Sequence, residues 1–240
     1  MSNISKSAFV LCAGKGTRMR PLTDHTPKPL VKIFDRPILE YIFDHLKAAD
    51  IEQVTLNGHY KAKQIENYAR QKSEDFEMSF SYEHDILETG GGIKKALYTM
   101  PQDTPFYVIN GDAFWTEKDP QNPALKRLVQ AWDDEAMDIL LLLQPVSKMT
   151  LTKGVGDYNI LEGGQIKRSK DQTGTHMFTG IRLVHARVFE FKSYSAFSFL
   201  ECMDDAEASG RLYGLEHEGL WHHISSPEDI TSVEQGEGRG

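Results

Sequence analysis

Short apolar runs alternate with stretches of helical periodicity through the first part of the chain. The apolar runs predict buried strands, at residues 8–11, 54–57, 76–82, 106–109 and 139–143. Apolar residues at helical spacing predict helices between them, at residues 37–50, 65–70, 93–98 and 124–132. This alternation is typical of an α/β fold with a mostly parallel sheet and helices on both of its faces.

The periodicity changes from Pro145 onward. Residues 157–168 predict a hairpin around a glycine-containing turn, and residues 177–184 predict another strand. Gly180 lies inside that strand, where a ligand or another backbone can approach closely. Residues 235–240 are expected to be disordered. Because no repeat or low-complexity linker interrupts the chain, we expect a single domain over residues 1–234, with halves at about 1–145 and 146–234.

Composition and charge limit the classes of function that this chain can have. The chain has 240 residues and a formal net charge of -8, which argues against a general nucleic-acid binder. No apolar run reaches the roughly 18 residues of a membrane span, and the first apolar run is too short for a signal peptide. Cys12 and Cys202 form neither a disulfide framework nor a metal-binding spacing. We therefore expect a cytoplasmic protein with no nucleic-acid or membrane partner.

The first apolar run leads into a turn that contains two glycines and several cationic residues, and Pro27-Lys28-Pro29-Leu30 closes it. Gly14 and Gly16 let the backbone approach a ligand, and the free N–H groups of such a turn bind anions. Lys15, Arg18 and Lys28 add positive charge suited to phosphates. Nearby prolines argue against a long helix, so we expect an extended loop around a nucleoside triphosphate. A surface turn with solvated basic side chains is the alternative.

Two better-known glycine loops do not fit this turn. A dinucleotide-binding fingerprint requires a third glycine where Met19 stands. A Walker A loop requires four residues between its glycine and the Gly-Lys-Ser/Thr sequence, and Gly14-Lys15-Gly16-Thr17 lacks this spacing.

The turn resembles the signature of the sugar-1-phosphate nucleotidyltransferases, Leu-x-x-Gly-x-Gly-x-Arg-x-x-Pro-Leu-Thr followed by Pro-Lys-Pro-Leu. The matching residues are Leu11, Gly14, Gly16, Arg18, Pro21, Leu22, Thr23, Pro27, Lys28, Pro29 and Leu30. Within that family, residues 87–93 are similar to short bacterial enzymes that make UDP-N-acetylmuramic acid from N-acetylmuramate 1-phosphate. The resemblance extends from about residue 7 to about residue 233.

This resemblance implies a Rossmann-like, doubly wound, mostly parallel sheet with a small β-rich C-terminal part that binds the sugar. It implies metal-dependent transfer of a nucleotidyl group from a nucleoside triphosphate, most simply UTP, to a sugar 1-phosphate. Pyrophosphate is released, and the sugar implied is N-acetylmuramate 1-phosphate, in cell-wall recycling. Mannose-1-phosphate guanylyltransferase activity is a rival, and a non-catalytic protein that binds nucleotides or sugar phosphates is another. The sequence leaves the base, the sugar and the oligomeric state open.

The resemblance also implies roles for the residues of the nucleotide site. Arg18 would hold the leaving pyrophosphate, and Lys28 would reach the α-phosphate. The stretch Glu88 to Gly92 would wall the base and ribose, although it is equally suited to begin a helix. The nucleotide-binding residues expected on this basis are Ala13, Gly14, Lys15, Gly16, Thr17, Arg18, Glu88, Gly91, Gly92 and Asn110.

Asp112 is the first expected metal ligand, since it follows a buried strand and a carboxylate suits Mg²⁺ bound to phosphates. Its alternative role is to cap the segment that follows. The family's second metal-binding aspartate lies in a Trp-x-Asp-x-Gly-Thr pattern, and here His223 stands in its place. Imidazole suits Mn²⁺, Zn²⁺ or Co²⁺ better than Mg²⁺. His223 has two further interpretations, hydrogen bonding to a metal-bound water and a structural role.

The expected sugar-binding residues are the least specific. Gly156, Asp157, Asn159, Thr179 and Gly180 occupy positions that resemble sugar-facing residues of the family. Chance surface polarity explains them almost as well. The glycine turn and Asp112 both follow the carboxyl ends of predicted strands, so we expect them to face each other across one crevice.

Overall fold

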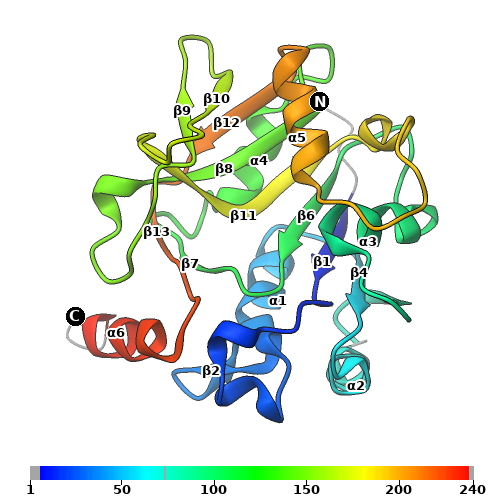
Figure 1. The fold of residues 1–240 in the computed structure, drawn as a ribbon, viewed down its shortest axis with the longest axis vertical. Coiled ribbons are helices and arrows are strands. Elements are labelled where there is room, and N and C mark those ends of the chain that lie inside the picture. Colours follow the sequence, from blue (N-terminus) through cyan, green and yellow to red (C-terminus); the bar gives the residue numbers. More distant parts are fainter. Residues whose placement is uncertain (1–5, 73, 238–240) are drawn as a thin grey trace.

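The computed structural model describes residues 6–72 and 74–237. Strands and helices alternate in the first part of the chain, so the predicted α/β class is confirmed (Figure 1). No helix in the described part is long and apolar enough to cross a lipid bilayer. The main elements of this part are β1 (Ser7–Leu11), α1 (Ile38–Ala48), β4 (Gln53–Gly58), α2 (Ala62–Gln71), β5 (Glu77–Tyr82), α3 (Glu88–Ala96), β6 (Phe106–Asn110), α4 (Ala124–Ala131) and β8 (Ile139–Pro145).

The later part of the chain contributes mostly strands. The predicted hairpin is present as two short antiparallel strands, and the predicted strand around Gly180 is present as β11. The elements are β9 (Tyr158–Ile160), β10 (Ile166–Arg168), β11 (His176–Val184), α5 (Leu200–Ala208), β12 (Leu212–Glu216) and α6 (Pro227–Glu237). Short pairs are β2 (Lys32–Ile33) with β3 (Arg36–Pro37), and β7 (Phe114–Thr116) with β13 (Leu220–His222).

One large sheet runs through both parts of the chain. Its strands β5, β4, β1 and β6 are parallel, as the sequence predicts. β11 then pairs antiparallel with β6 on one side and with β8 on the other, and β12 continues parallel to β8. The sheet is therefore mixed: its parallel centre is bordered by β11, an antiparallel strand from the second half, which separates β6 from β8.

The sheet has a hydrophobic core on each face. Side chains of successive strand residues point to opposite faces. In β1, accordingly, Val10 packs in one cluster with residues of α1, α2 and α4, whereas Phe9 packs in another with residues of α3 and α5. Leu140 and Leu141 of β8 divide in the same way between the two clusters. The helices therefore cover both faces, as expected.

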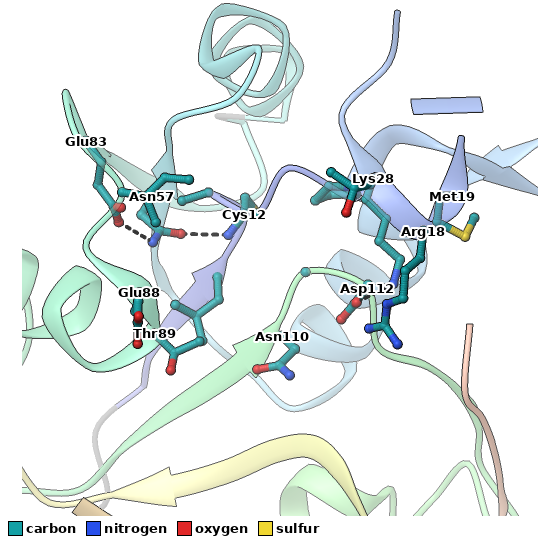
Figure 2. A pocket seen from close by; sticks show the side chains of 18 of the residues that line it. Cys12, Arg18, Met19, Lys28, Asn57, Glu83, Glu88, Thr89, Asn110 and Asp112 are labelled. Atoms are coloured by element: carbon teal, nitrogen blue, oxygen red, sulfur yellow. Dashed lines mark hydrogen bonds and ion pairs between the residues drawn. The ribbon is translucent and has the colours of Figure 1, made fainter. Parts of the chain in front are cut away.

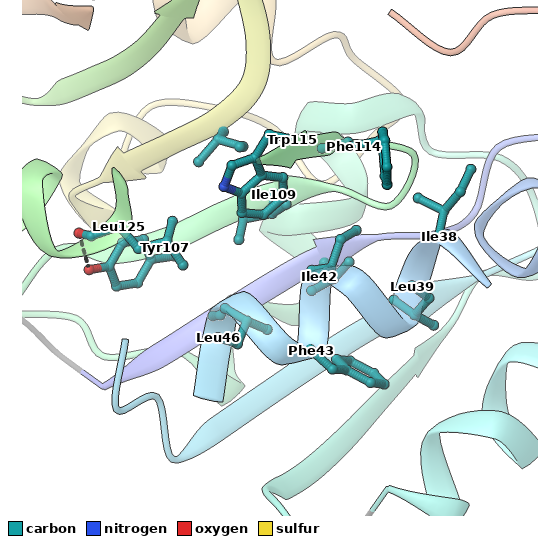
Figure 3. Close-up of a cluster of buried hydrophobic side chains, with 14 of the residues drawn as sticks. Ile38, Leu39, Ile42, Phe43, Leu46, Tyr107, Ile109, Phe114, Trp115 and Leu125 are labelled. Atoms are coloured by element: carbon teal, nitrogen blue, oxygen red, sulfur yellow. Dashed lines mark hydrogen bonds between the residues drawn. The ribbon is translucent and has the colours of Figure 1, made fainter. Parts of the chain in front are cut away.

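Helix α1 shows how the apolar periodicity directs packing. Its buried side chains share one core with those of β6 and β7 (Figure 3). Phe43 points away from these strands and packs against Tyr68 and Phe76. The Tyr107 hydroxyl lies in this core and donates to the Leu125 carbonyl at 2.8 Å, so its polar atom is satisfied. The helix stripe consists of Ile38, Leu39, Ile42, Phe43 and Leu46.

Three local predictions were wrong. The segment after Gly16 is not extended but forms short 3₁₀ turns at Thr17–Met19, Leu22–Asp24 and Lys28–Leu30, because proline is compatible with a single turn although not with a long helix. Helix α6 continues to residue 237, with Val233 buried, so residues 235–237 are helical instead of disordered. Residues 238–240 of the predicted tail lie outside the described residues.

The third correction concerns α3, which begins at Glu88 and not near Ile93. Its first turns contain three glycines, which disfavour a helix in isolation. Here the N–H groups of Gly90 and Gly91 both donate to the Phe197 carbonyl, at 2.9 and 3.1 Å. Contacts with a distant segment therefore stabilise a helix that the local sequence does not favour.

Leu141→Ala is expected to lower the free energy of unfolding by about 2–5 kcal/mol, because Leu141 is fully buried in β8. Leu161→Ala is the matched control, since Leu161 is 46% exposed, and we expect a change within about 0.5 kcal/mol. Urea denaturation followed by circular dichroism measures both. Similar losses in the two variants would contradict the placement of β8 in the core.

Candidate active site

A cavity of about 350 Å³ opens at the carboxyl ends of the parallel strands. Leu11 ends β1, Asn57 lies near the end of β4, and Asn110 ends β6, and all three line it. Ligands of open α/β sheets bind at this edge of the sheet. The residues that approach the cavity come from segments far apart in the sequence (Figure 2).

The glycine turn forms one wall of this cavity. Gly16 has a φ of 61°, and a Cβ there would lie 3.0 Å from the Cβ of Lys28, so the position favours glycine. A Cβ at Gly14 would meet no atom within 4 Å, so the backbone here is open to a ligand. Lys15 is exposed and does not line the cavity. The expected nucleotide residues that do line it are Ala13, Gly14, Gly16, Thr17, Arg18, Glu88 and Asn110.

Lys28 and Asp112 meet beside Arg18 of the glycine turn (Figure 2). The Lys28 ammonium donates to Asp112 Oδ2 at 2.6 Å and to the Ile224 carbonyl at 2.6 Å (Figure 2). The Asp112 side chain is 39% exposed and the Lys28 side chain is 12% exposed. The carboxylate is thus open to solvent and to a ligand, and the glycine turn and Asp112 face one cavity, as expected.

Asn57 and Glu83, which the sequence analysis did not identify, form a buried pair that supports the glycine turn. The Cys12 backbone N–H donates to Asn57 Oδ1 at 2.6 Å, and Asn57 Nδ2 donates to Glu83 Oε1 at 2.6 Å (Figure 2). Glu83 Oε2 accepts from the Leu87 N–H at 3.1 Å. The signal available in the sequence was a polar Asn57 at the carboxyl end of a predicted buried strand. This chain of bonds fixes the start of the glycine turn relative to α3.

Besides Lys15, two expected nucleotide-binding residues, Gly91 and Gly92, do not line the cavity. A Cβ at Gly91 would lie 2.4 Å from the Ser195 carbonyl oxygen, and one at Gly92 would lie 2.6 Å from Glu83 Oε1. Both glycines therefore allow α3 to pack closely, instead of forming a wall for the base. Thr89 of the same helix does line the cavity.

His223 lies close enough to Asp112 for the two side chains to interact electrostatically. Burial lowers the pKa of its imidazole below the ordinary value, and Lys28 and Arg18 lower it further. The imidazole is therefore neutral near pH 7, which is the form that binds metals. In the described part of the chain, no group of three or more His, Cys, Asp or Glu side chains is arranged to hold a metal. A cation here would depend on Asp112, on His223 and on ligand oxygens.

Ser225 lines the cavity next to this region. Its N–H and hydroxyl donate to Asp229 Oδ2 at 2.8 and 3.0 Å, and the Ser226 N–H donates to the same oxygen at 2.8 Å. The Asp229 carboxylate is thus occupied in holding the start of α6, and these backbone and hydroxyl groups lower its pKa.

A second pocket of about 320 Å³ adjoins the first, and Thr89 and Asn110 line both. Of the residues expected to face the sugar, Asp157 lines this pocket. Four others do not: Gly156, Asn159, Thr179 and Gly180. The sequence analysis did not identify most of the remaining polar lining, which includes Arg168, Ser169, Lys170, Gln172, Arg182 and Ser198.

Those four residues instead shape the strands around the second pocket. A Cβ at Gly156 would overlap the Gly174 backbone, and Asn159 Oδ1 accepts from the Thr175 N–H at 3.1 Å. Thr179 is buried and its hydroxyl donates to the Leu142 carbonyl at 2.8 Å. Gly180 has a φ of 81°, and a Cβ there would lie 2.8 Å from Asn110 Nδ2. The glycines here thus allow close backbone packing, and the polar side chains form hydrogen bonds within the protein.

Residues 7–155 match the nucleotidyl transferase family. The chain belongs to this family. The resemblance to sugar-1-phosphate nucleotidyltransferases stated from the signature is thereby confirmed, and so is the expectation of an enzyme.

Relatives of this nucleotidyltransferase cover almost the whole chain. It is 32% identical over 239 residues to N-acetylmuramate alpha-1-phosphate uridylyltransferase of Caulobacter vibrioides, covering 98% of each chain. It is 27% identical to D-glycero-alpha-D-manno-heptose 1-phosphate guanylyltransferase of Aneurinibacillus thermoaerophilus, covering 95% of this chain and 96% of the relative. A UDP-glucose pyrophosphorylase complexed with UDP-glucose has the same fold, with a TM-score of 0.78, 17% identity, and coverage of 98% and 99%.

Asn57→Ala is expected to weaken nucleotide binding by this nucleotidyltransferase and to lower the free energy of unfolding by about 1–3 kcal/mol, because it removes the bonds that Asn57 makes with the Cys12 N–H and Glu83 Oε1. Asn122→Ala is the control, since the Asn122 side chain accepts an exposed bond from Gln130. Urea denaturation and titration with nucleotide measure the two effects. Equal behaviour of the variants would argue against a supporting role for Asn57.

Proposed function

We propose that this nucleotidyltransferase transfers the uridylyl group of UTP to N-acetylmuramate 1-phosphate and releases pyrophosphate. The observation that carries the proposal is that the glycine turn, Lys28 and Asp112 face one cavity. The Caulobacter vibrioides relative, similar over nearly the whole chain, supports the choice of both substrates. The product, a nucleotide sugar of the cell wall, suits a role in recycling that material. A reducing cytoplasm, which we propose as its location, agrees with the two buried free cysteines.

In this proposal, each of the two pockets holds one of the two substrates. Residues up to about 145 contribute nearly all of the first cavity, which would hold the nucleotide. Residues after 146 contribute most of the second pocket, which would hold the sugar. Thr89 and Asn110, which border both, would lie where the nucleotide and the sugar phosphate meet.

The chemistry requires positioning and charge stabilisation more than a covalent intermediate. An oxygen of the sugar phosphate forms a bond to the α-phosphorus, and the bond from that phosphorus to the bridging oxygen breaks as pyrophosphate leaves. The N–H groups of the glycine turn and Arg18 would hold the departing phosphates. Lys28, next to Asp112, would stabilise charge on the α-phosphate.

The residues present fit a divalent cation such as Mg²⁺ or Mn²⁺. Asp112 offers a partly exposed carboxylate and His223 a neutral imidazole, and phosphate oxygens and water complete such a site. When bound, the cation would neutralise the charge of the polyphosphate. Without it, the Lys28 ammonium provides the positive charge beside Asp112.

A panel of substrates tests the proposed function. Pyrophosphate release is measured with UTP, GTP, CTP and dTTP, each combined with N-acetylmuramate 1-phosphate, N-acetylglucosamine 1-phosphate and mannose 1-phosphate. We expect the highest kcat/KM for UTP with N-acetylmuramate 1-phosphate, by about tenfold or more over the other pairs. A higher value for GTP with any sugar would reject the proposal.

Asp112→Asn is expected to lower kcat by about 100- to 1,000-fold, because it removes the negative charge that would bind the cation beside the reacting phosphate. The fold should be retained, since the side chain is partly exposed. Asp119→Asn, in an exposed turn, is the control and should leave kcat unchanged. Unchanged turnover in Asp112→Asn would remove this carboxylate from the mechanism.

His223→Asp is expected to move metal preference from Mn²⁺ toward Mg²⁺, since a carboxylate suits Mg²⁺ better than an imidazole does. The ratio of kcat/KM with Mg²⁺ to that with Mn²⁺ is the measurement. His84→Asp serves as control, because the His84 side chain is 90% exposed. An unaltered ratio in His223→Asp would show that His223 does not bind the cation.

A further inference from the structure

Arg182 is a buried cation that lines the second pocket. It lies on β11, is 2% exposed, and its Nη1 donates to Asn110 Oδ1 at 3.3 Å. Its Nε is buried and has no hydrogen-bond partner. Among the described residues, no carboxylate forms an ion pair with it, whereas other arginines of the second half, such as Arg168 and Arg187, do have carboxylate partners.

An unpaired guanidinium is costly to bury, and burial lowers the pKa of Arg182 to about 9. Two aromatic rings offer further compensation, with their centroids 4.4 Å (Phe199) and 5.4 Å (Phe178) from the guanidinium carbon. A leucine or methionine would fill this space at lower cost if packing were the only requirement. The missing partner is therefore expected to arrive with a ligand.

The charges around the pocket favour an anion. Arg168, Lys170 and Arg182 line it together with one acid, Asp157, so these four side chains carry two net positive charges, although the whole chain carries -8. Arg168 is paired with Asp204 at 3.0 Å, outside the pocket lining. Asp157 accepts from the Phe178 N–H at 3.0 Å. Arg182 is the buried member of the set, and Lys170 is exposed at its edge.

The position of the pocket identifies the class of anion. Asn110 borders both pockets and lies two residues before Asp112. The sugar 1-phosphate, which reacts with the nucleotide, would therefore lie on the side of the first cavity. A negative group near Arg182 would then be a second anionic group of the sugar, separate from its 1-phosphate. A carboxylate matches the planar donor edge of a guanidinium.

We propose that Arg182, with Lys170 at the edge of the same pocket, binds a carboxylate carried by the sugar and thereby selects an acidic sugar 1-phosphate. This inference rests on the function proposed above, because it assumes that the second pocket holds the sugar. It assigns to Arg182 a role in specificity and none in the bond-making step.

The test compares N-acetylmuramate 1-phosphate with its carboxamide, in which a neutral amide replaces the carboxylate at nearly the same size. In the unaltered enzyme, the KM of the carboxamide should exceed that of the carboxylate by about 10- to 100-fold, the value of one or two hydrogen bonds to a charged group. In Arg182→Met, the KM of the carboxylate should rise to that of the carboxamide, while the KM of UTP stays unchanged.

Arg36→Met is the matched control, since Arg36 is a surface residue paired with Asp44, and the discrimination should be preserved there. Arg182→Met should have a urea midpoint no lower than that of the unaltered enzyme, because it loses an unpaired buried charge. A structural role alone would instead lower the midpoint and raise the KM of both sugars equally. If Arg182→Met does not fold, the KM values of the carboxylate and the carboxamide still test the proposal, measured in Lys170→Met and in the unaltered enzyme.

The outcomes separate this inference from the proposed function. Transfer to both compounds with equal KM in the unaltered enzyme would overturn the inference and leave the function standing. If a neutral sugar 1-phosphate is the preferred acceptor, both are rejected. Preference for another acidic sugar, abolished by Arg182→Met, would support the inference and reject N-acetylmuramate as the substrate.

Discussion

The carboxyl ends of β1 and β6 are held together by a hydrogen bond from the Gly111 N–H to the Leu11 carbonyl, at 2.8 Å. A Cβ at Gly111 would lie 2.6 Å from that oxygen, so a larger residue would push the strand ends apart. Beyond this contact the two segments separate, one into the glycine turn and the other into Asp112. The ion pair of Lys28 with Asp112 spans the resulting gap. The opposed anion-binding backbone and carboxylate thus result from two parallel strands that end side by side.

Much of the fold was predictable because local pattern and tertiary packing agree. The apolar stripe of α1 and the apolar runs of β1, β6 and β8 are buried as their periodicity predicts. The start of α3 was not predictable, since glycine disfavours a helix and the compensating bonds come from Phe197, far along the chain. The turns after Gly16 were missed for a related reason: proline excludes a long helix but permits a single turn.

The residues of the candidate site were likewise predictable only in part. The glycine turn, Arg18, Lys28 and Asp112 were found because adjacent residues carry their chemistry and the strand ends place them. Asn57 and Arg182 were missed, since each gains its importance from a partner, or a missing partner, that only the folded chain brings near.

Residues expected to contact the sugar illustrate the reverse error. Thr179 and Gly180 have the polarity and freedom of a binding residue, yet the Thr179 hydroxyl satisfies a backbone carbonyl and Gly180 makes room for Asn110. A short polar residue in a strand therefore identifies a region of close contact better than it identifies a ligand contact.

The Ile224 carbonyl accepts from the same ammonium group that binds Asp112. The C-terminal segment therefore supplies a hydrogen-bond acceptor to a site whose recognisable signature lies at the other end of the chain. β11 likewise lies between β6 and β8, inside the sheet and not beside it. The family match ends at residue 155, before either of these contributions. The signature-bearing segment is consequently not a module that evolution or an engineer can transplant alone. An excised N-terminal half would keep the motif and the ion pair of Lys28 with Asp112, but it would expose a sheet edge and lose the Ile224 carbonyl as the second acceptor of Lys28.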